Sequence, residues 1–285
     1  MNILMSVFLG IIQGLTEFLP VSSSGHLVLF REFFGFEGTY AGGLFFDTLL
    51  HIGTLISVFI IFHKDIKELI VEFFGLIGDL FRGKKNLIQG KPYRRMIIML
   101  ILSTLPLFLV VPFVSTIETI FFGSLLVTGF ALLTTGTILF ISSKLPHGTK
   151  DAGNAKFRSA FIVGIAQMFA AVIPGISRSG STIVTGEATG FTRQFAAKFS
   201  FLMSIIAIIG ATVVQLPDAI EQYAATPGAI RESLVPYIVG VVVAAITGII
   251  AIKYMLKLIN KGKFHVFAYY CWTIGTIAVV SSFFM

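Results

Sequence analysis

Long apolar runs separated by short polar connections dominate this chain. Six of the runs are long enough to cross a hydrocarbon core of about 30 Å as a helix, and they fall at residues 43–63, 93–114, 119–141, 195–216, 236–257 and 265–284. The hydropathy pattern therefore predicts six transmembrane helices.

Two further apolar stretches, 3–34 and 157–190, are each interrupted in the middle. The first stops at Pro20-Val-Ser-Ser-Ser-Gly-His26, and the second stops at Pro174-Gly-Ile-Ser-Arg-Ser-Gly-Ser-Thr182. Proline removes a backbone donor and glycine permits unusual dihedral angles, so both motifs favour a helix that breaks and restarts. Because each half is too short to span comfortably, we expect two re-entrant helical hairpins.

The two interrupted stretches resemble each other. Gly10-Ile-Ile-Gln13 and Pro20 match Gly164-Ile-Ala-Gln167 and Pro174 at one constant offset, and Ser24-Gly25 matches Ser179-Gly180 after one inserted residue. Each stretch is followed by three predicted spans, so the second copy must enter the membrane from the opposite side. The sequence predicts two inverted repeats, 1–141 and 157–285, within a single membrane domain covering 1–285.

Composition supports an all-α integral membrane protein, a polytopic helical bundle with about six transmembrane helices and the two hairpins. The chain is 55% hydrophobic and only 12% charged, with a mean hydropathy of +0.92, which excludes an ordinary soluble domain. The net charge of +7 does not indicate nucleic acid, because the basic residues lie in short loops between apolar runs. A lone cysteine, Cys271, excludes an internal disulfide.

The loop charges predict an orientation. Connections 64–92, 142–158 and 258–263 are rich in lysine and arginine, whereas 115–118 and 217–235 contain only Arg231. The positive-inside rule places the basic loops in the cytoplasm and both termini outside. Within the first basic loop, residues 66–77 have apolar positions at helical spacing, from which we expect an amphipathic surface helix, with a plain helical loop as the open alternative.

Several polar residues fall at membrane depth, where they are rare and usually functional. Gln13 and Glu17 are four residues apart and share a helix face, and Arg178 lies at the second break, where a guanidinium can clamp phosphate oxygens. The serines beside each break suit an anion-binding helix N-terminus. Together these residues predict a phosphate site inside a membrane.

The same residues suggest a phosphoryl-transfer chemistry. Glu17 with Gln13 offers oxygen ligands for Mg²⁺ or Ca²⁺, His26 can act as acid or base, and Ser23 can attack or orient water. Simpler alternatives stay open: the serines as helix caps, Glu17 with Arg178 as a structural ion pair, and His26 as a packing residue. His51 is a weaker candidate for lining the cavity, while Asp47 and Lys198 lie near segment ends.

Two long motifs carry a family resemblance. Gln13-Gly-Leu-Thr-Glu17 with the adjoining Phe18-Leu-Pro-Val-Ser-Ser-Ser-Gly-His26, and then Pro174-Gly-Ile-Ser-Arg-Ser-Gly-Ser-Thr182, resemble the motifs of the BacA-type undecaprenyl-diphosphate phosphatases. The resemblance covers the whole chain. One difference is that the acidic motif begins with Gln13 rather than glutamate, which removes a charge from the proposed metal site.

The resemblance implies an enzyme of the bacterial cell membrane that removes the terminal phosphate of the C55 polyprenyl diphosphate carrier for reuse in cell-wall synthesis. It also implies dependence on a divalent metal, an active site open to the outer face, and bacitracin resistance. It assigns catalytic roles to Glu17, Ser23, His26 and Arg178, and metal binding to Glu17 with Gln13. Diphosphate binding falls to Arg178 with the neighbouring hydroxyls of Ser22, Ser24, Ser177, Ser179 and Thr182.

The main rival hypothesis is a flippase that moves a polyprenyl phosphate without hydrolysis, because inverted repeats with broken helices are typical of transporters. Release of phosphate distinguishes the two. The sequence does not fix the oligomeric state, and a homodimer is one option. Membrane lipids are the remaining expected partners.

Overall fold

The computed structural model describes residues 2–34, 43–113, 116–117, 124–224, 229–261 and 263–284. These ranges are almost entirely helical, and their only strand-like pairing is an isolated bridge between Lys150 and Phe191. The α-helices are α1 (Ile3–Phe18), α2 (Ser23–Phe34), α3 (Gly43–Ile61), α4 (His63–Phe81), α5 (Pro92–Thr104), α7 (Leu125–Ser142), α8 (Phe157–Val172), α9 (Arg178–Ala188), α10 (Arg193–Ala224), α11 (Ala229–Asn260) and α12 (Val266–Ser281).

The helices confirm a polytopic membrane protein. Four described segments are long and apolar enough to span a bilayer: Pro92–Phe113, Leu125–Ser142, Arg193–Asp218 and Leu234–Asn260. A fifth span comes from α3 if it is counted with α4, although the two helices meet at an angle of 84°. The predicted span 265–284 is the shorter apolar helix α12, and residues 119–123 of another predicted span lie outside the described residues.

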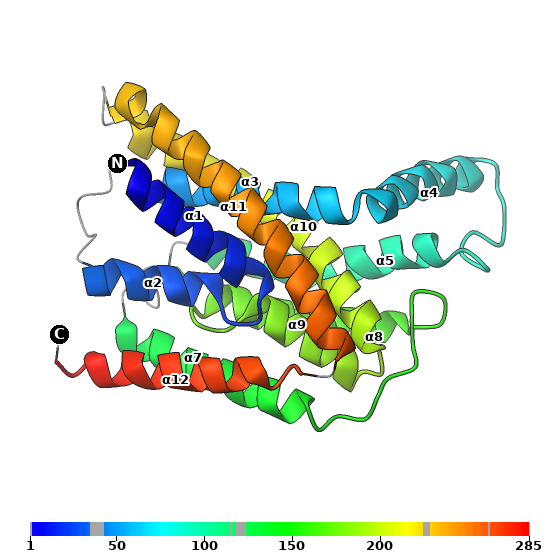
Figure 1. Cartoon of the computed structure of the whole chain (residues 1–285). Helices are drawn as coiled ribbons and strands as arrows, with labels where there is room; N and C mark the ends of the chain where they lie inside the picture. The colour runs from blue at the N-terminus through cyan, green and yellow to red at the C-terminus, as the bar shows by residue number, and fades with distance from the viewer. Residues whose placement is uncertain are drawn as a thin grey trace.

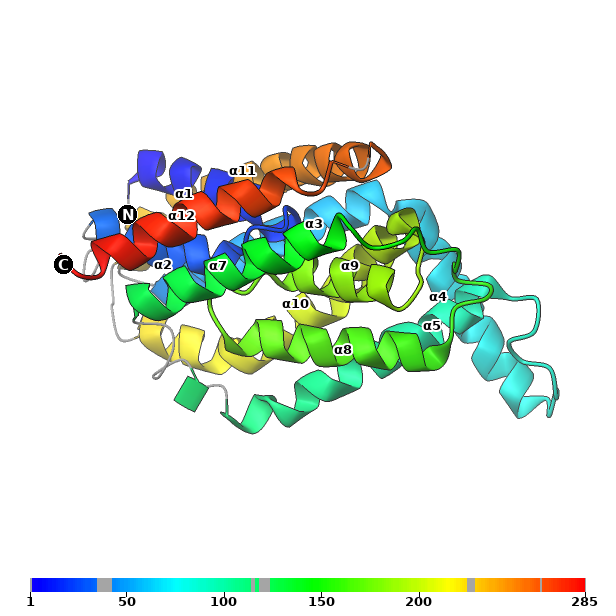
Figure 2. The same cartoon turned by 90° about the horizontal axis from the view of Figure 1, so that it is seen from below.

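The two interrupted stretches form helical hairpins that approach each other from opposite ends of the bundle. α1 starts at the end where both chain termini lie, whereas α8 starts at the other end, beside α5 (Figures 1 and 2). α2 and α9 each turn back from the middle of the bundle toward the end from which their hairpin entered (Figure 1). The hairpins therefore meet near the centre of the molecule.

Small residues allow the hairpins to pack closely on the long helices. α1 lies along α11, where a Cβ on Gly10 would come within 2.7 Å of the Gly240 carbonyl oxygen. α8 lies along α5 in the same way, where a Cβ on Gly164 would come within 2.4 Å of the Ser103 carbonyl oxygen. Close backbone approach through small residues is common between membrane helices.

These two contacts involve residues that the sequence comparison aligned, Gly10 and Gly164. They are what two inverted repeats would produce, because the first helix of each copy packs on a helix of the other copy: α1 on α11 and α8 on α5. The division at 1–141 and 157–285 nevertheless remains a prediction.

The amphipathic helix predicted at 66–77 is present as part of α4. This helix lies at the end of the bundle far from both termini (Figures 1 and 2), and it is fastened to α5 by charged side chains. Arg94 donates to Glu72 (2.6 Å) and to Asp79 (2.9 Å). Hydrogen bonds from Lys84 and Arg94 also hold the pKa of Asp79 well below its ordinary value, so Asp79 stays ionised at any physiological pH.

Candidate functional site

The tip of the first hairpin is shaped by a proline and a strained serine. α1 ends at Phe18, Leu19 is extended, and Ser22 has a φ of 70°, which is uncommon for a residue with a side chain. The Ser22 hydroxyl accepts a hydrogen bond from the Gly25 amide (3.2 Å). This bond caps the returning helix α2 and helps to hold Ser22 in its unusual conformation.

The tip of the second hairpin uses a glycine for the corresponding turn. Gly175 has a φ of 98°, and a Cβ there would lie 2.6 Å from the Thr128 carbonyl oxygen. Ser177 caps α9 by accepting from the Gly180 amide (3.1 Å). Thr135 of α7 stabilises this loop, because its hydroxyl donates to the Gly175 carbonyl (2.9 Å) and accepts from the Ser177 amide (3.0 Å).

The two tips are in direct contact. A Cβ on Gly25 would lie 2.9 Å from the Gly175 Cα, and a Cβ on Gly180 would lie 3.3 Å from the Pro20 Cβ. The Ser179 hydroxyl donates to the Leu19 carbonyl (3.2 Å). The capped N-termini of α2 and α9 therefore come together from opposite directions.

A small polar cavity lies between these N-termini, with a volume of about 50 Å³. This is room for a few water molecules or a group of similar size. The lining residues come from both hairpins: Thr16, Glu17, Ser22, Ser23, Ser24, Ala170, Ile176, Ser177, Arg178 and Ser179. Seven of the predicted site residues thus surround one cavity: Glu17, Ser22, Ser23, Ser24, Ser177, Arg178 and Ser179.

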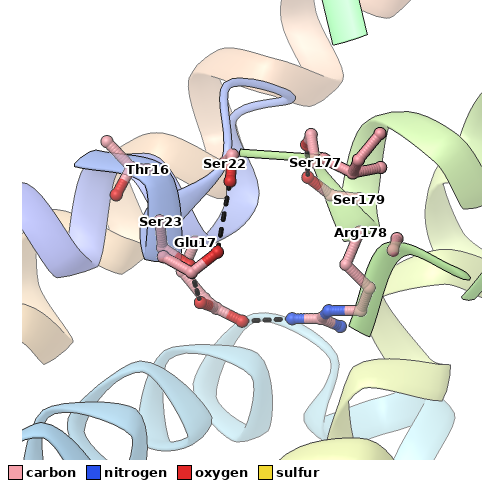
Figure 3. Close-up of a pocket in the computed structure, with 10 residues that line it drawn as sticks. Thr16, Glu17, Ser22, Ser23, Ser177, Arg178 and Ser179 are labelled. Atoms are coloured by element: carbon pink, nitrogen blue, oxygen red, sulfur yellow. Dashed lines mark hydrogen bonds and ion pairs between the residues drawn. The ribbon is translucent and has the colours of Figure 1, made fainter. Parts of the chain in front are cut away.

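Glu17 is the centre of the hydrogen-bond network. Its Oε2 accepts from the Ser23 hydroxyl (2.8 Å) and from the Gln13 amide (3.1 Å), and its Oε1 accepts from the Arg178 guanidinium. Figure 3 shows Glu17 and Arg178 pointing toward each other from the two hairpins. The ion pair that the sequence offered as the simpler alternative is therefore present.

The cavity contains more polar groups than an ion pair needs. Five serine hydroxyls line it together with Glu17 and Arg178, and the first amides of two helices lie beside it. A helix N-terminus carries a partial positive charge and favours anions. We therefore interpret the pair as part of an anion-binding site.

The residues present fit an oxygen-seeking divalent cation. Gln13 is fully buried, and its side-chain oxygen has no hydrogen-bond partner, although its amide group contacts Glu17. A carboxylate and an amide oxygen are ligands that suit Mg²⁺ or Ca²⁺, and Mg²⁺ commonly takes its other ligands from water and substrate phosphate. The described residues contain no cluster of three or more His, Cys, Asp or Glu side chains for a metal, so the protein would supply few ligands.

Three predicted site residues do not line the cavity. Gln13 reaches it only through Glu17. Thr182 is buried behind it on α9, with its hydroxyl 2.7 Å from that of Ser200. His26 lies 2.8 Å from the Ser22 carbonyl through Nδ1 and 2.8 Å from the Tyr270 hydroxyl through Nε2, so its ring faces α12.

His51 of α3 is the imidazole that approaches Glu17. Its Nε2 lies 3.8 Å from Glu17 Oε2, and its Nδ1 lies 2.8 Å from the Asp47 carbonyl oxygen. A carbonyl only accepts, so Nδ1 carries a proton, and Nε2 is the ring nitrogen that faces the carboxylate. The sequence signal for His51 was weak, because only its depth in an apolar run singled it out.

The fold and the site define a class: a polytopic helical membrane protein in which two broken helices meet around an anion-binding cavity. Comparison with protein families gives the particular family. Residues 6–277 match the family model described as bacitracin resistance protein BacA, so the chain belongs to the BacA family.

Three named relatives match this chain over nearly their full length. The undecaprenyl-diphosphatase of Methanobrevibacter smithii is 41% identical over 285 residues, covering 99% of this chain and 98% of the relative. That of Alkaliphilus metalliredigens is 41% identical, covering 97% and 98%. That of Methanosphaera stadtmanae is 42% identical, covering 99% of both chains.

Proposed function

We propose that this protein is an undecaprenyl-diphosphatase, a membrane hydrolase that removes the terminal phosphate of a polyprenyl diphosphate. The observation that carries the proposal is the cavity between the two hairpin tips, where Glu17, Arg178 and five serines converge. The undecaprenyl-diphosphatase activity for which relatives about 40% identical over the full length are named supports it.

The second hairpin would bind the diphosphate. Arg178 can donate two parallel hydrogen bonds to phosphate oxygens, and its side chain keeps partial access to the cavity. Ser177 and Ser179 line the same wall, and the N-terminus of α9 adds its amide groups. Preorganised donors of this kind stabilise charge that develops in a transition state.

The first hairpin would supply the nucleophile and its base. The Ser23 hydroxyl already donates to Glu17 (2.8 Å), which is the geometry in which a carboxylate takes a proton from an attacking hydroxyl. If Ser23 attacks directly, its Oγ bonds to the terminal phosphorus, its proton passes to Glu17, the bond from that phosphorus to the bridging oxygen breaks to release polyprenyl phosphate, and water then hydrolyses the phosphoserine. If Ser23 instead orients a water molecule, the water attacks the same phosphorus, its proton passes to Glu17, and the same bond breaks. His51 lies close to the same Glu17 oxygen, Oε2. Its imidazole can therefore take up part of the change in charge when the carboxylate gains or loses a proton.

A divalent cation would be held by Glu17 and Gln13 and, when bound, would neutralise phosphate charge. In the structure, both Glu17 oxygens are occupied by protein donors. Glu17 must therefore release Arg178 or exchange one of its other donors before it can hold a cation.

The location and orientation follow from the same proposal. The substrate's tail stays in the bilayer of the bacterial cell membrane, and the site opens to the outer face with both termini outside. The fold is consistent with this, because both termini lie at the end opposite the basic connection that follows α4 (Figure 1).

The proposal is tested by phosphate release from a polyprenyl diphosphate by detergent-purified protein, with Mg²⁺, with Ca²⁺ and with EDTA. We expect metal-dependent release that Arg178→Ala reduces by a factor of about 10² to 10³. Arg158→Ala is a matched control, because Arg158 is exposed at the start of α8. A well-folded wild type that binds the lipid without releasing phosphate would instead favour a flippase.

A further inference from the structure

α4 presents an apolar face that nothing in the described chain covers. Five of its large apolar side chains are at least half exposed, from Ile70 at 52% to Phe81 at 88%: Ile70, Val71, Phe74, Leu80 and Phe81. On a helix, most of these positions fall on one side. The opposite side carries Asp65, Glu72 and Asp79, which bind α5 and α10 through Tyr93, Arg94 and Lys198.

The orientation of α4 suits the membrane surface. It follows α3 after a bend of 84°, so if α3 crosses the bilayer close to the normal, α4 lies nearly parallel to the membrane plane. It projects from the bundle at the end away from the termini (Figure 2). A helix that leaves a spanning segment in this way places its apolar face at the boundary between headgroups and acyl chains.

Basic side chains frame this apolar face. Lys64 and Lys67 lie in its first turns, and Arg82 and Lys85 follow its last residue; all four are exposed. No ion pair involves these four among the described residues, whereas the neighbouring Lys84 is bound to Asp79 (2.7 Å). Lysine and arginine near the interface attract anionic lipid headgroups, and each contributes about fivefold to the binding equilibrium.

We propose that α4 is a binding surface for anionic phospholipids of the leaflet on the side opposite the termini. The apolar side chains insert at the level of the first acyl carbons, and the four basic residues hold the phosphate groups of the surrounding headgroups. The surface is remote from the cavity between the hairpin tips and is independent of hydrolysis.

The test depends on selective labelling, which is possible because the chain has a single native cysteine. Cys271 is buried, so a cysteine at position 74 can be labelled selectively with an environment-sensitive fluorophore, and unlabelled wild type measures any background. F74C protein is reconstituted into vesicles of phosphatidylcholine alone or mixed with phosphatidylglycerol. E68C is the matched control, because Glu68 is exposed on a different side of the same helix.

We expect the probe at position 74 to shift to the blue and to be quenched by lipids carrying a nitroxide near the headgroup, more strongly when phosphatidylglycerol is present. The probe at position 68 should stay in water. Replacing Lys64, Lys67, Arg82 and Lys85 with glutamine should abolish the extra blue shift and the extra quenching that phosphatidylglycerol produces. K261Q/K263Q, at another basic connection, should leave it unchanged.

Two outcomes would overturn the proposal. Equal quenching in both lipid mixtures would show that α4 meets the bilayer without recognising anionic headgroups. A blue-shifted probe that lipid nitroxides do not quench, in a protein that forms dimers, would show that a second copy covers the face instead.

Discussion

In both hairpins a buried glutamine precedes a proline and a serine caps the returning helix, yet the hairpins differ at many aligned positions, two of which carry the main polar side chains of the site. Glu17 of the first aligns with Ala171 of the second, and Ser23 aligns with Arg178. Glu17 contacts Ser23 of its own hairpin through one oxygen and Arg178 of the other through the second. The site is therefore made where the resemblance between the hairpins fails.

This difference shows how two hairpins of similar shape can carry different polar side chains. The shared part of each hairpin, the proline break and the cap, brings two helix N-termini together and creates an anion site. In the proposed mechanism the unshared side chains then divide the tasks, with a base and a nucleophile on one side and a cationic clamp on the other.

The largest effect is expected from exchanging the charges between the hairpins. E17R and R178E alone each bring two like charges together, and loss of a buried ion pair by itself already costs about 3–5 kcal/mol of stability. The double variant E17R/R178E restores the pair and should recover much of that stability, but phosphate release should stay at least about 10³-fold below wild type. Thermal unfolding and phosphate release measure the two quantities.

Recovery of both stability and activity in the double variant would show that the pair only joins the hairpins. The assignment of different tasks to the two hairpins would then be wrong.

A smaller effect is expected when only the charge of the first hairpin is removed. Glu17→Gln keeps the shape of the side chain but releases Arg178 from its ion pair. The metal-free protein should therefore bind inorganic phosphate about tenfold more tightly, since a hydrogen bond to a charged group contributes about 1.5–3 kcal/mol, while turnover is lost. Isothermal titration of phosphate into the EDTA-treated variant measures the change, with E68Q as the control.

Unchanged or weaker phosphate binding by E17Q would contradict the idea that Glu17 and the anion compete for Arg178.

The smallest effect is expected from a change in the turn at the tip of the second hairpin. Gly175→Ala places a Cβ at a φ of 98° and 2.6 Å from the Thr128 carbonyl oxygen, so it should lower stability by about 1–3 kcal/mol. Gly78→Ala is the control, because nothing lies within 4 Å of a Cβ there. If thermal unfolding of the two variants agrees, the second tip is less constrained than its geometry indicates.

The sequence predicted the hairpins because their signals are local. Proline and glycine after an apolar run mark a helix break wherever the chain goes afterwards, and an arginine at membrane depth demands an anionic partner. The pairing of Glu17 with Arg178 was only the simpler alternative to an anionic ligand, and the structure shows that pair. α4 was likewise visible in its helical spacing of apolar positions.

The two histidines could not be placed from sequence. His26 follows the serine run and its ring faces Tyr270, whereas His51 reaches Glu17. Both outcomes depend on how α3 and α12 pack against the first hairpin, and α12 is more than two hundred residues away along the chain. The strained φ of Ser22 was hidden for the same reason, because serine carries no signal for a left-handed turn.

The contact between Gly25 and Gly175 also bears on whether protons can leak across the membrane through the protein. Each hairpin breaks the low-dielectric layer that keeps a membrane potential, and two such breaks in line could conduct protons. Where the tips meet, however, backbone packs directly on backbone, and a Cβ on Gly25 would lie only 2.9 Å from Gly175 Cα. The space between these two glycines is therefore too small for a water molecule, which opposes a continuous water path through the two breaks.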